Sequence, residues 1–132
     1  MGFEEIPHTA DWCVRVWSED LKGLFIEAAR AMYHLTGIKL NQVPRVKHEF
    51  SYQASEPESL LIAFLSELVY YLEHDKVAFE KFDLSLQDER LFVAMEGAQI
   101  DGLNKAIKAV TWHNLKIVQT LSGLETEIVF DV

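Results

Sequence analysis

The stretch from Glu56 to Glu73 constrains the fold most strongly, because it predicts a helix that is apolar around most of its surface. Its helix-spaced inner stripe consists of Leu61, Phe64, Leu65, Leu68 and Leu72, and Leu60, Ile62, Val69 and Tyr71 widen that stripe. Such a helix must be mostly covered by other elements. The preceding Ser55-Glu56-Pro57-Glu58 matches a capping box, which predicts serine as the N-cap residue and Glu58 as the third helical residue.

A second helix is predicted after Ser18-Glu19-Asp20, where polar residues signal a helix start. Apolar residues follow at helical spacing: Leu21, Leu24, Phe25, Ala28, Met32 and Leu35. Gly37 suits the position just beyond the end of that helix.

Alternating or β-rich runs predict strands at 11–17, 45–53, 77–86, 90–96, 109–119 and 125–131. Gln87-Asp88-Glu89 and Ser122-Gly123 lie between successive strands and predict two hairpins. Strands, two helices and further strands predict an α+β fold. We expect residues 1–132 to form one compact domain, with both helices packed on a largely antiparallel sheet built from hairpins.

Composition limits the classes of function. The longest apolar run, Leu60 to Leu65, is too short to span a membrane, and the N-terminus lacks the pattern of a secretory signal. Cys13 is the only cysteine, which excludes an internal disulfide, fits a reducing cytoplasm and suggests a small buried apolar residue. The net charge of −9 repels phosphate backbones, so we expect no strong direct nucleic-acid binding.

The end of the last predicted strand suggests a cation site. Asp131 places a carboxylate next to the α-carboxylate of Val132, and together they form half of a site for a hard cation. Asp11, at the start of another predicted strand, is the leading candidate for a third ligand. Oxygen donors of this kind suit calcium, magnesium or manganese and do not favour zinc.

Three more residues have two interpretations each. His113 shares a face of the predicted strand 109–119 with apolar residues, which favours a core or boundary histidine over a ligand. Lys108 precedes that strand, and composition alone favours a lysine that only solvates the surface. Glu67 borders the apolar stripe of the long helix, so it is either a surface glutamate or a contact near the site or a partner.

Four segments, taken in order, resemble the archease family over nearly the whole chain. They are His8-Thr9-Ala10-Asp11, the helical stretch from Leu61 to Tyr70, Lys108-Ala109-Val110-Thr111-Trp112-His113, and the terminal Val129-Phe130-Asp131-Val132. The resemblance implies an accessory protein, not an enzyme, that activates the GTP-dependent RNA-splicing ligase in tRNA splicing and RNA repair. It implies that the chain promotes guanylylation and repeated turnover of that ligase.

The same resemblance implies a metal site, seen with calcium in the family, whose ligands map onto Asp11, Asp131 and Val132. It also implies a functionally important lysine at Lys108. We expect four residues to be functional or to face the partner: Lys108, His113, Glu67 and His8.

Two other classes of function stay open. One is a metal-dependent phosphotransfer or hydrolytic enzyme in which Lys108 or His113 moves protons. Against it, the sequence has no Gly-rich phosphate loop and no recognisable nucleophile–base pair. The other is an interaction module whose carboxylates only tie strand ends together.

Overall fold

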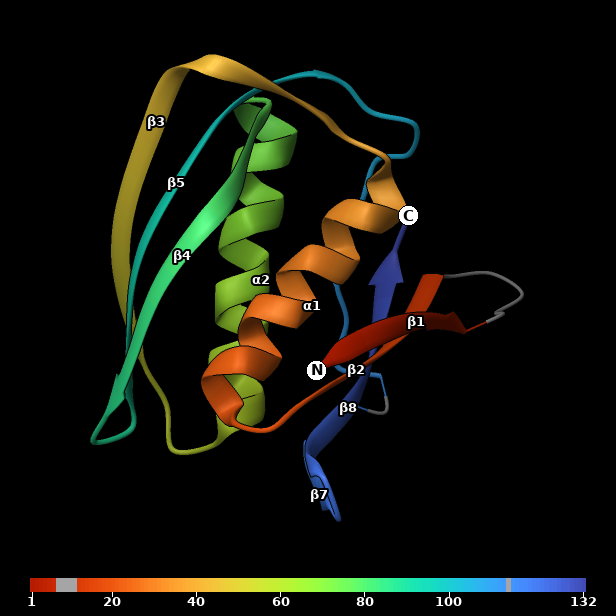
Figure 1. Cartoon of the computed structure of the whole chain (residues 1–132), viewed down its shortest axis with the longest axis vertical. Helices are drawn as coiled ribbons and strands as arrows, with labels where there is room; N and C mark the ends of the chain where they lie inside the picture. The colour runs from red at the N-terminus through yellow and green to blue at the C-terminus, as the bar shows by residue number, and fades with distance from the viewer. Residues whose placement is uncertain (7–11, 114) are drawn as a thin grey trace.

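Two helices form the middle layer of the fold, and a β-sheet lies on each side of them (Figure 1). This computed structural model describes residues 1–6, 12–113 and 115–132. The helices are α1 (Leu21–Thr36) and α2 (Pro57–His74). One sheet has the strand order β3 (Lys39–Gln53), β5 (Arg90–Gly102), β4 (Val77–Gln87).

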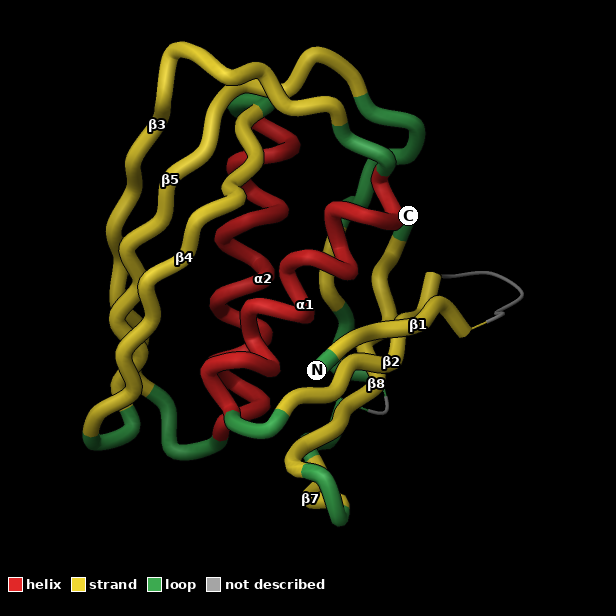
Figure 2. The backbone as a smooth tube through the Cα atoms, viewed as in Figure 1, coloured by secondary structure: helices red, strands yellow, loops and turns green. Residues whose placement is uncertain are grey.

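The other sheet has the strand order β1 (Gly2–Ile6), β2 (Trp12–Ser18), β8 (Gly123–Asp131), β6 (Ala109–Val110), and β7 (Val118–Thr120) also pairs with β8. Every strand pairing in the described residues is antiparallel. The strands, coloured yellow in Figure 2, lie on both sides of the two red helices. The α+β class, with two helices on antiparallel sheet, is therefore confirmed. The short strand β1 was not predicted from the sequence.

Helix α2 occupies the core as its apolar surface predicts. Each of the five residues of its inner stripe is at most 3% exposed. The helix contacts β3 and β4 of one sheet and β6 of the other. Contact with both sheets explains why apolar residues surround most of the helix.

The predicted cap of α2 is wrong by one residue. Glu56, not Ser55, is the N-cap residue, and its side chain makes no capping hydrogen bond. Pro57 occupies the first helical position, where its fixed φ angle suits a helix start, and it restricts the preceding residue to the extended conformation that Glu56 adopts. The carboxylate of Glu58 instead accepts a hydrogen bond of 2.9 Å from the backbone N–H of Ile117.

Helix α1 has the termini that its sequence predicts. Asp20 is the N-cap residue, and its carboxylate accepts a hydrogen bond of 2.8 Å from the backbone N–H of Gly23. Gly37 follows the helix in the left-handed conformation, with φ of 63°. Both ends are therefore encoded locally.

The hairpin of β4 and β5 is confirmed, and both flanking strands are longer than predicted. Asp88 and Glu89 form its two-residue turn, and both have positive φ angles, as such tight hairpin turns require. Strand β5 runs on to Gly102 and pairs with β3 along most of its length.

The prediction of one continuous strand over 109–119 is wrong. β6 ends at Val110 and β7 begins only at Val118, and the described residues between them form no strand. Along β8, the seven positions 111–117 lie opposite only the four positions 126–129, so continuous pairing is impossible. Beyond Thr111, whose backbone N–H still donates to the carbonyl oxygen of Val129, the described residues of this segment form no strand, and the backbone N–H of Ile117 is held by Glu58.

Cys13 is 4% exposed, in agreement with its interpretation as a small buried residue, and burial raises the pKa of its thiol. Neither helix in the described part of the chain is long and apolar enough to cross a membrane.

Candidate metal and partner-binding site

Three strand ends meet at one end of the five-stranded sheet. β8 lies between β2 and β6, and Trp12 at the start of β2 pairs with Phe130. On the other side of β8, Ala109 pairs with Asp131. The C-terminal end of β8 therefore lies beside the beginnings of both neighbouring strands.

Lys108 and Asp131 are direct neighbours at this end of the sheet. The backbone N–H of Lys108 donates a hydrogen bond of 2.8 Å to the carbonyl oxygen of Asp131. Both residues are exposed, and no hydrogen bond or ion pair within the described residues engages either side chain. An ammonium group just before β6 and a carboxylate at the end of β8, neither with a side-chain partner among the described residues, are thus 23 positions apart along the chain and joined by a backbone hydrogen bond in space.

Val132 follows Asp131 and packs partly buried against the hydrophobic core. This contact holds the position after Asp131 in place, close to the exposed carboxylate of its neighbour. Among the predicted metal ligands, Asp131 and Val132 therefore lie at the same strand end.

Asp11 and His8 lie outside the described residues, so their roles stay predictions. The first described residue after Asp11 is Trp12, at the start of β2. The ring of Trp12 lies 4.7 Å from the ammonium group of Lys105, a cation–π contact.

The donor chemistry at this strand end fits a hard cation. The Asp131 carboxylate is exposed and has no internal partner in the described residues, so its oxygens are available as ligands. The described residues alone contain no group of three His, Cys, Asp or Glu that could hold a metal. A cation here would therefore need donors in addition to Asp131, such as the carboxylates of Asp11 and of Val132.

His113 does not occupy the position that alternation predicts. It lies exposed in the segment between β6 and β7, and its backbone N–H donates a hydrogen bond of 3.3 Å to the hydroxyl of Thr111. Its interpretation as a core or boundary histidine is wrong, because the strand on which that interpretation depended ends at Val110. A functional role for His113 stays a prediction.

Glu67 points from α2 toward β3, whereas Lys108 lies next to another side of the same helix. Its carboxylate is 2.9 Å from Nε2 of His48, and the hydroxyl of Tyr71 is 3.2 Å from Nδ1 of the same ring. Burial, together with the charge of Glu67, raises the pKa of Tyr71. Glu67 thus links α2 to β3 within the protein, and any contact with a partner stays a prediction.

A hollow of about 220 Å³ lies between α2 and β6 next to Lys108. Tyr70 and His74, one helical turn apart, line it, with ring centroids 4.5 Å apart, and the side chain of Tyr70 is 52% exposed. These rings were not among the site residues predicted from the sequence. The sequence pattern that could have indicated them is an aromatic pair at positions i and i+4 on the polar side of an otherwise apolar helix.

The model of the family described as "Archease protein family (MTH1598/TM1083)" matches residues 3–132. The chain belongs to the archease family. A protein from Methanosarcina acetivorans named "Protein archease" is 30% identical and matches 98% of this chain and 95% of its own length. A "Protein archease" from Methanopyrus kandleri is 29% identical, and the match covers all of both chains. The family resemblance drawn from the four segments is thereby confirmed.

Two solved structures share the archease fold of this chain. Protein 1598 of Methanobacterium thermoautotrophicum aligns with a TM-score of 0.74 and 22% identity, over 99% of both chains. The Thermotoga maritima protein TM1083, described as an archease and possible chaperone, aligns with a TM-score of 0.73 and 24% identity, over 98% of this chain and 96% of its own. At this level of identity the likeness concerns the fold.

Proposed function

We propose that this member of the archease family is a metal-binding accessory protein that activates the GTP-dependent RNA-splicing ligase in tRNA splicing and RNA repair. In this proposal the chain promotes guanylylation of the ligase and its repeated turnover, and performs no catalysis itself. The observation that carries the proposal is the adjacency of Lys108 and Asp131, both exposed and both without an internal side-chain partner in the described residues. The description of the Thermotoga maritima relative as a possible chaperone supports an accessory role.

The proposed metal ligands are the carboxylates of Asp11, Asp131 and Val132, and the cation is calcium, magnesium or manganese. A bound cation would supply positive charge for an acidic or phosphate group of the partner. The ammonium group of Lys108 adds a second positive charge beside the same strand end, and it can bind such a group as a point charge.

The proposed partner is the ligase protein and not its RNA. The net charge of −9 opposes binding to a phosphate backbone, whereas a local pair of positive charges can still act on a single group. We place the chain in the cytoplasm, where such a ligase would meet its substrates.

A guanylylation assay with a purified ligase of this class tests the proposal. The labelled GMP attached to the ligase is measured over time, with divalent metal, in the absence and presence of this protein. We expect the protein to accelerate the reaction, and we expect Asp131→Asn to remove most of the acceleration and of the metal binding measured by titration calorimetry.

Glu127→Gln is the matched control, because Glu127 is an exposed carboxylate of the same strand four residues away. It should retain both activities. No acceleration by the unaltered protein would overturn the proposal, and so would robust turnover of GTP or RNA by the isolated chain, which would indicate the enzyme alternative.

A further inference from the structure

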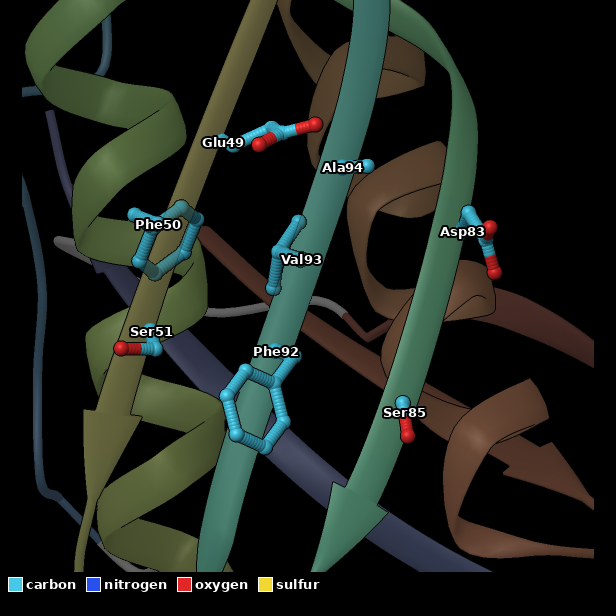
Figure 3. A pocket seen from close by; sticks show the side chains of 8 residues that line it. All are labelled: Glu49, Phe50, Ser51, Asp83, Ser85, Phe92, Val93 and Ala94. Carbon is cyan, nitrogen blue, oxygen red and sulfur yellow. The ribbon is translucent and has the colours of Figure 1, made fainter.

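The outer face of the three-stranded sheet, on the side away from the helices, has a shallow hollow at its centre. Two rows of side chains form it: Ser51, Phe92 and Ser85 in one row, and Glu49, Ala94 and Asp83 in the next (Figure 3). The hollow has a volume of about 460 Å³, and a neighbouring one of about 360 Å³ shares the second row. Phe50 and Val93, which alternate with these residues, belong to the core on the opposite face.

The shape of the hollow follows from its residues. Ala94 in the central strand has the smallest side chain of its row, with a longer carboxylate side chain on the strand to each side. Two strand spacings separate Glu49 from Asp83, which is about 10 Å between their backbones. Phe92 is 43% exposed and provides an apolar surface next to this acidic row.

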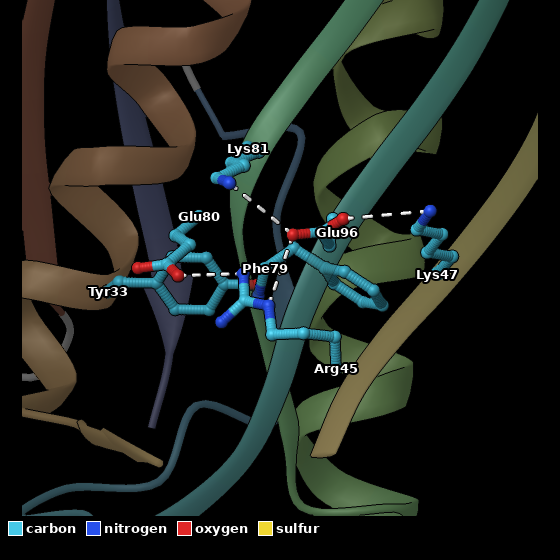
Figure 4. Close-up of polar contacts among 7 residues, drawn as sticks. All are labelled: Tyr33, Arg45, Lys47, Phe79, Glu80, Lys81 and Glu96. Carbon is cyan, nitrogen blue, oxygen red and sulfur yellow. Dashed lines mark hydrogen bonds and ion pairs between the residues drawn. The ribbon is translucent and has the colours of Figure 1, made fainter. Parts of the chain in front are cut away.

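The basic residues of the same face do not neutralise this acidic row. Arg45, Lys47 and Lys81 all approach Glu96, at 3.1, 4.0 and 3.5 Å, and Arg45 also pairs with Glu80 at 2.7 Å (Figure 4). No ion pair or hydrogen bond of the described residues engages the side chain of Glu49 or Asp83, and both are exposed. The face therefore presents two unpaired carboxylates between an exposed aromatic ring and a row that is already paired.

We infer that this face docks an extended segment of a partner protein that carries an arginine two residues away from an apolar side chain. The guanidinium group binds between Glu49 and Asp83, its methylene groups pack on Ala94, and the apolar side chain covers Phe92. Residues two apart in an extended segment point to the same side at about the spacing of Phe92 and Ala94. The planar, multiply donating guanidinium group suits two separate carboxylates better than the compact ammonium group of lysine.

Two features of the face support a short arginine-bearing segment over a polycation or a nucleic acid. The row of Lys47, Glu96 and Lys81 adds positive charge beside the hollow, which disfavours a run of basic residues. The two unpaired carboxylates repel phosphates. Arg90 lies in the row on the other side of Phe92, with its guanidinium 6.0 Å from the ring centroid, and it donates a hydrogen bond of 2.7 Å to the side-chain oxygen of Gln53, so it does not pair with Glu49 or Asp83.

The inferred docking face and the strand end at Asp131 lie on different sides of the helix layer (Figure 1). A partner on the outer sheet face would therefore leave Lys108 and Asp131 accessible. The inference does not depend on the proposed role with the ligase.

The test uses the blocked peptide acetyl-Ser-Phe-Ser-Arg-Ser-amide, titrated into the isotope-labelled protein and followed by amide chemical shifts. We expect saturable shifts at residues 49–51, 83–85 and 92–94. The double variant Glu49→Gln/Asp83→Asn should raise the dissociation constant about fivefold, the size expected for two exposed ion pairs. Phe92→Ser should weaken binding of the same peptide by a similar factor.

The matched control is Glu5→Gln/Asp101→Asn, which removes two exposed strand carboxylates elsewhere. It should leave the dissociation constant within about twofold, and a peptide with norleucine in place of arginine should bind at least about fivefold more weakly, since it loses the same two ion pairs. Thermal midpoints of all variants show whether each is folded. Unsaturable shifts, shifts centred elsewhere, or equal weakening by the control pair would overturn the inference. A short single-stranded RNA that binds this face more tightly than the peptide would overturn it too.

Discussion

Among single residues, Gly97 occupies a position in the middle of β5 that leaves no room for a side chain. It pairs with Val46 on one side and Phe79 on the other, next to an irregularity in the pairing of β4. A Cβ atom at this position would overlap the carbonyl oxygen of Ala78. Because that atom is backbone, the sheet itself would have to shift.

We expect Gly97→Ala to lower the free energy of unfolding by more than about 2 kcal/mol, through strain in the sheet. Urea denaturation followed by circular dichroism measures the change. Gly102→Ala in the same strand is the control, since nothing lies within 4 Å of its added Cβ atom. The control should stay within about 0.5 kcal/mol of the unaltered protein, and equal losses in both variants would contradict the overlap argument.

Lys108 has the clearest functional test at this scale. If it acts on the ligase, Lys108→Ala should leave the thermal midpoint nearly unchanged, because an exposed unpaired charge contributes little to stability. The same variant should lose most of the guanylylation activity, and Lys108→Arg should show whether charge alone suffices. Lys116→Ala is the control, because it removes an exposed lysine whose backbone lies against Thr126 of β8, away from Asp131, and it should retain the activity. Full activation by both Lys108 variants would return this residue to a purely solvating role.

The sequence pointed to Asp131 through its place at a strand end and to Lys108 through the family resemblance, but it could not predict that they are neighbours. Their contact depends on which residue of β6 lies opposite Asp131, and nothing local to either segment determines that register. Predictions from local sequence were correct where a single segment determines the structure. Asp20 and Gly37 specify the two ends of α1 because their own side chain or backbone supplies the cap.

At the scale of elements, the break between β6 and β7 shows why periodicity misplaced His113. Thr111, His113, Leu115 and Ile117 alternate as in a strand, yet the described part of this segment leaves the sheet. The break depends on the pairing with β8, a separate segment of the sequence, which accepts Val110 opposite Phe130 and Val118 opposite Glu125. An alternating pattern reports which residues prefer burial and cannot report a change of pairing partner.

The start of α2 provides a stability prediction for an element. Its N-cap residue, Glu56, is extended, but its side chain makes no capping hydrogen bond. Aspartate has the shorter side chain that accepts from the first-turn N–H groups, and it keeps the charge. We expect Glu56→Asp to raise the free energy of unfolding by roughly 0.5–1 kcal/mol, measured by urea denaturation.

Ser55→Ala distinguishes this cap from the one that the sequence predicted. If Glu56 is the N-cap residue, Ser55→Ala should change stability by less than about 0.5 kcal/mol, whereas loss of a capping serine costs about 1 kcal/mol. A large loss in Ser55→Ala, together with no gain in Glu56→Asp, would place the cap at Ser55 after all.

At the scale of the whole molecule, the two sheets carry different surface features. The five-stranded sheet brings together Lys108, Asp131 and the start of β2, while the three-stranded sheet presents an outer face of charged residues. Helix α2 lies between the two sheets and contacts both. Its apolar residues, which surround most of the helix, correctly predicted that it is covered on more than one side. The division of strands between two sheets had no such signal.

The ion-pair cluster on the outer sheet face connects the stability of the whole molecule to pH. The hydrogen bond from Arg45, together with the charge of Lys81, holds the pKa of Glu96 below its usual value of 4.5. A carboxyl group whose pKa is lower in the folded state stabilises the fold above its unfolded pKa. That contribution is lost as the pH falls through the lower, folded pKa.

We therefore expect Glu96→Gln to lower the thermal midpoint at pH 7, and we expect its difference from the unaltered protein to shrink as the pH falls from 4.5 toward 3. Thermal unfolding at several pH values in this range measures the effect, and high salt should reduce it because the cluster is partly exposed.

Glu49→Gln is the matched control on the same face, because the described residues form no ion pair with Glu49. Its difference from the unaltered protein should stay small at every pH. If Glu96→Gln instead lowered the midpoint equally at pH 7 and pH 3, the loss would come from packing or shape, and the charge of Glu96 would not be what holds the three strands together at this point.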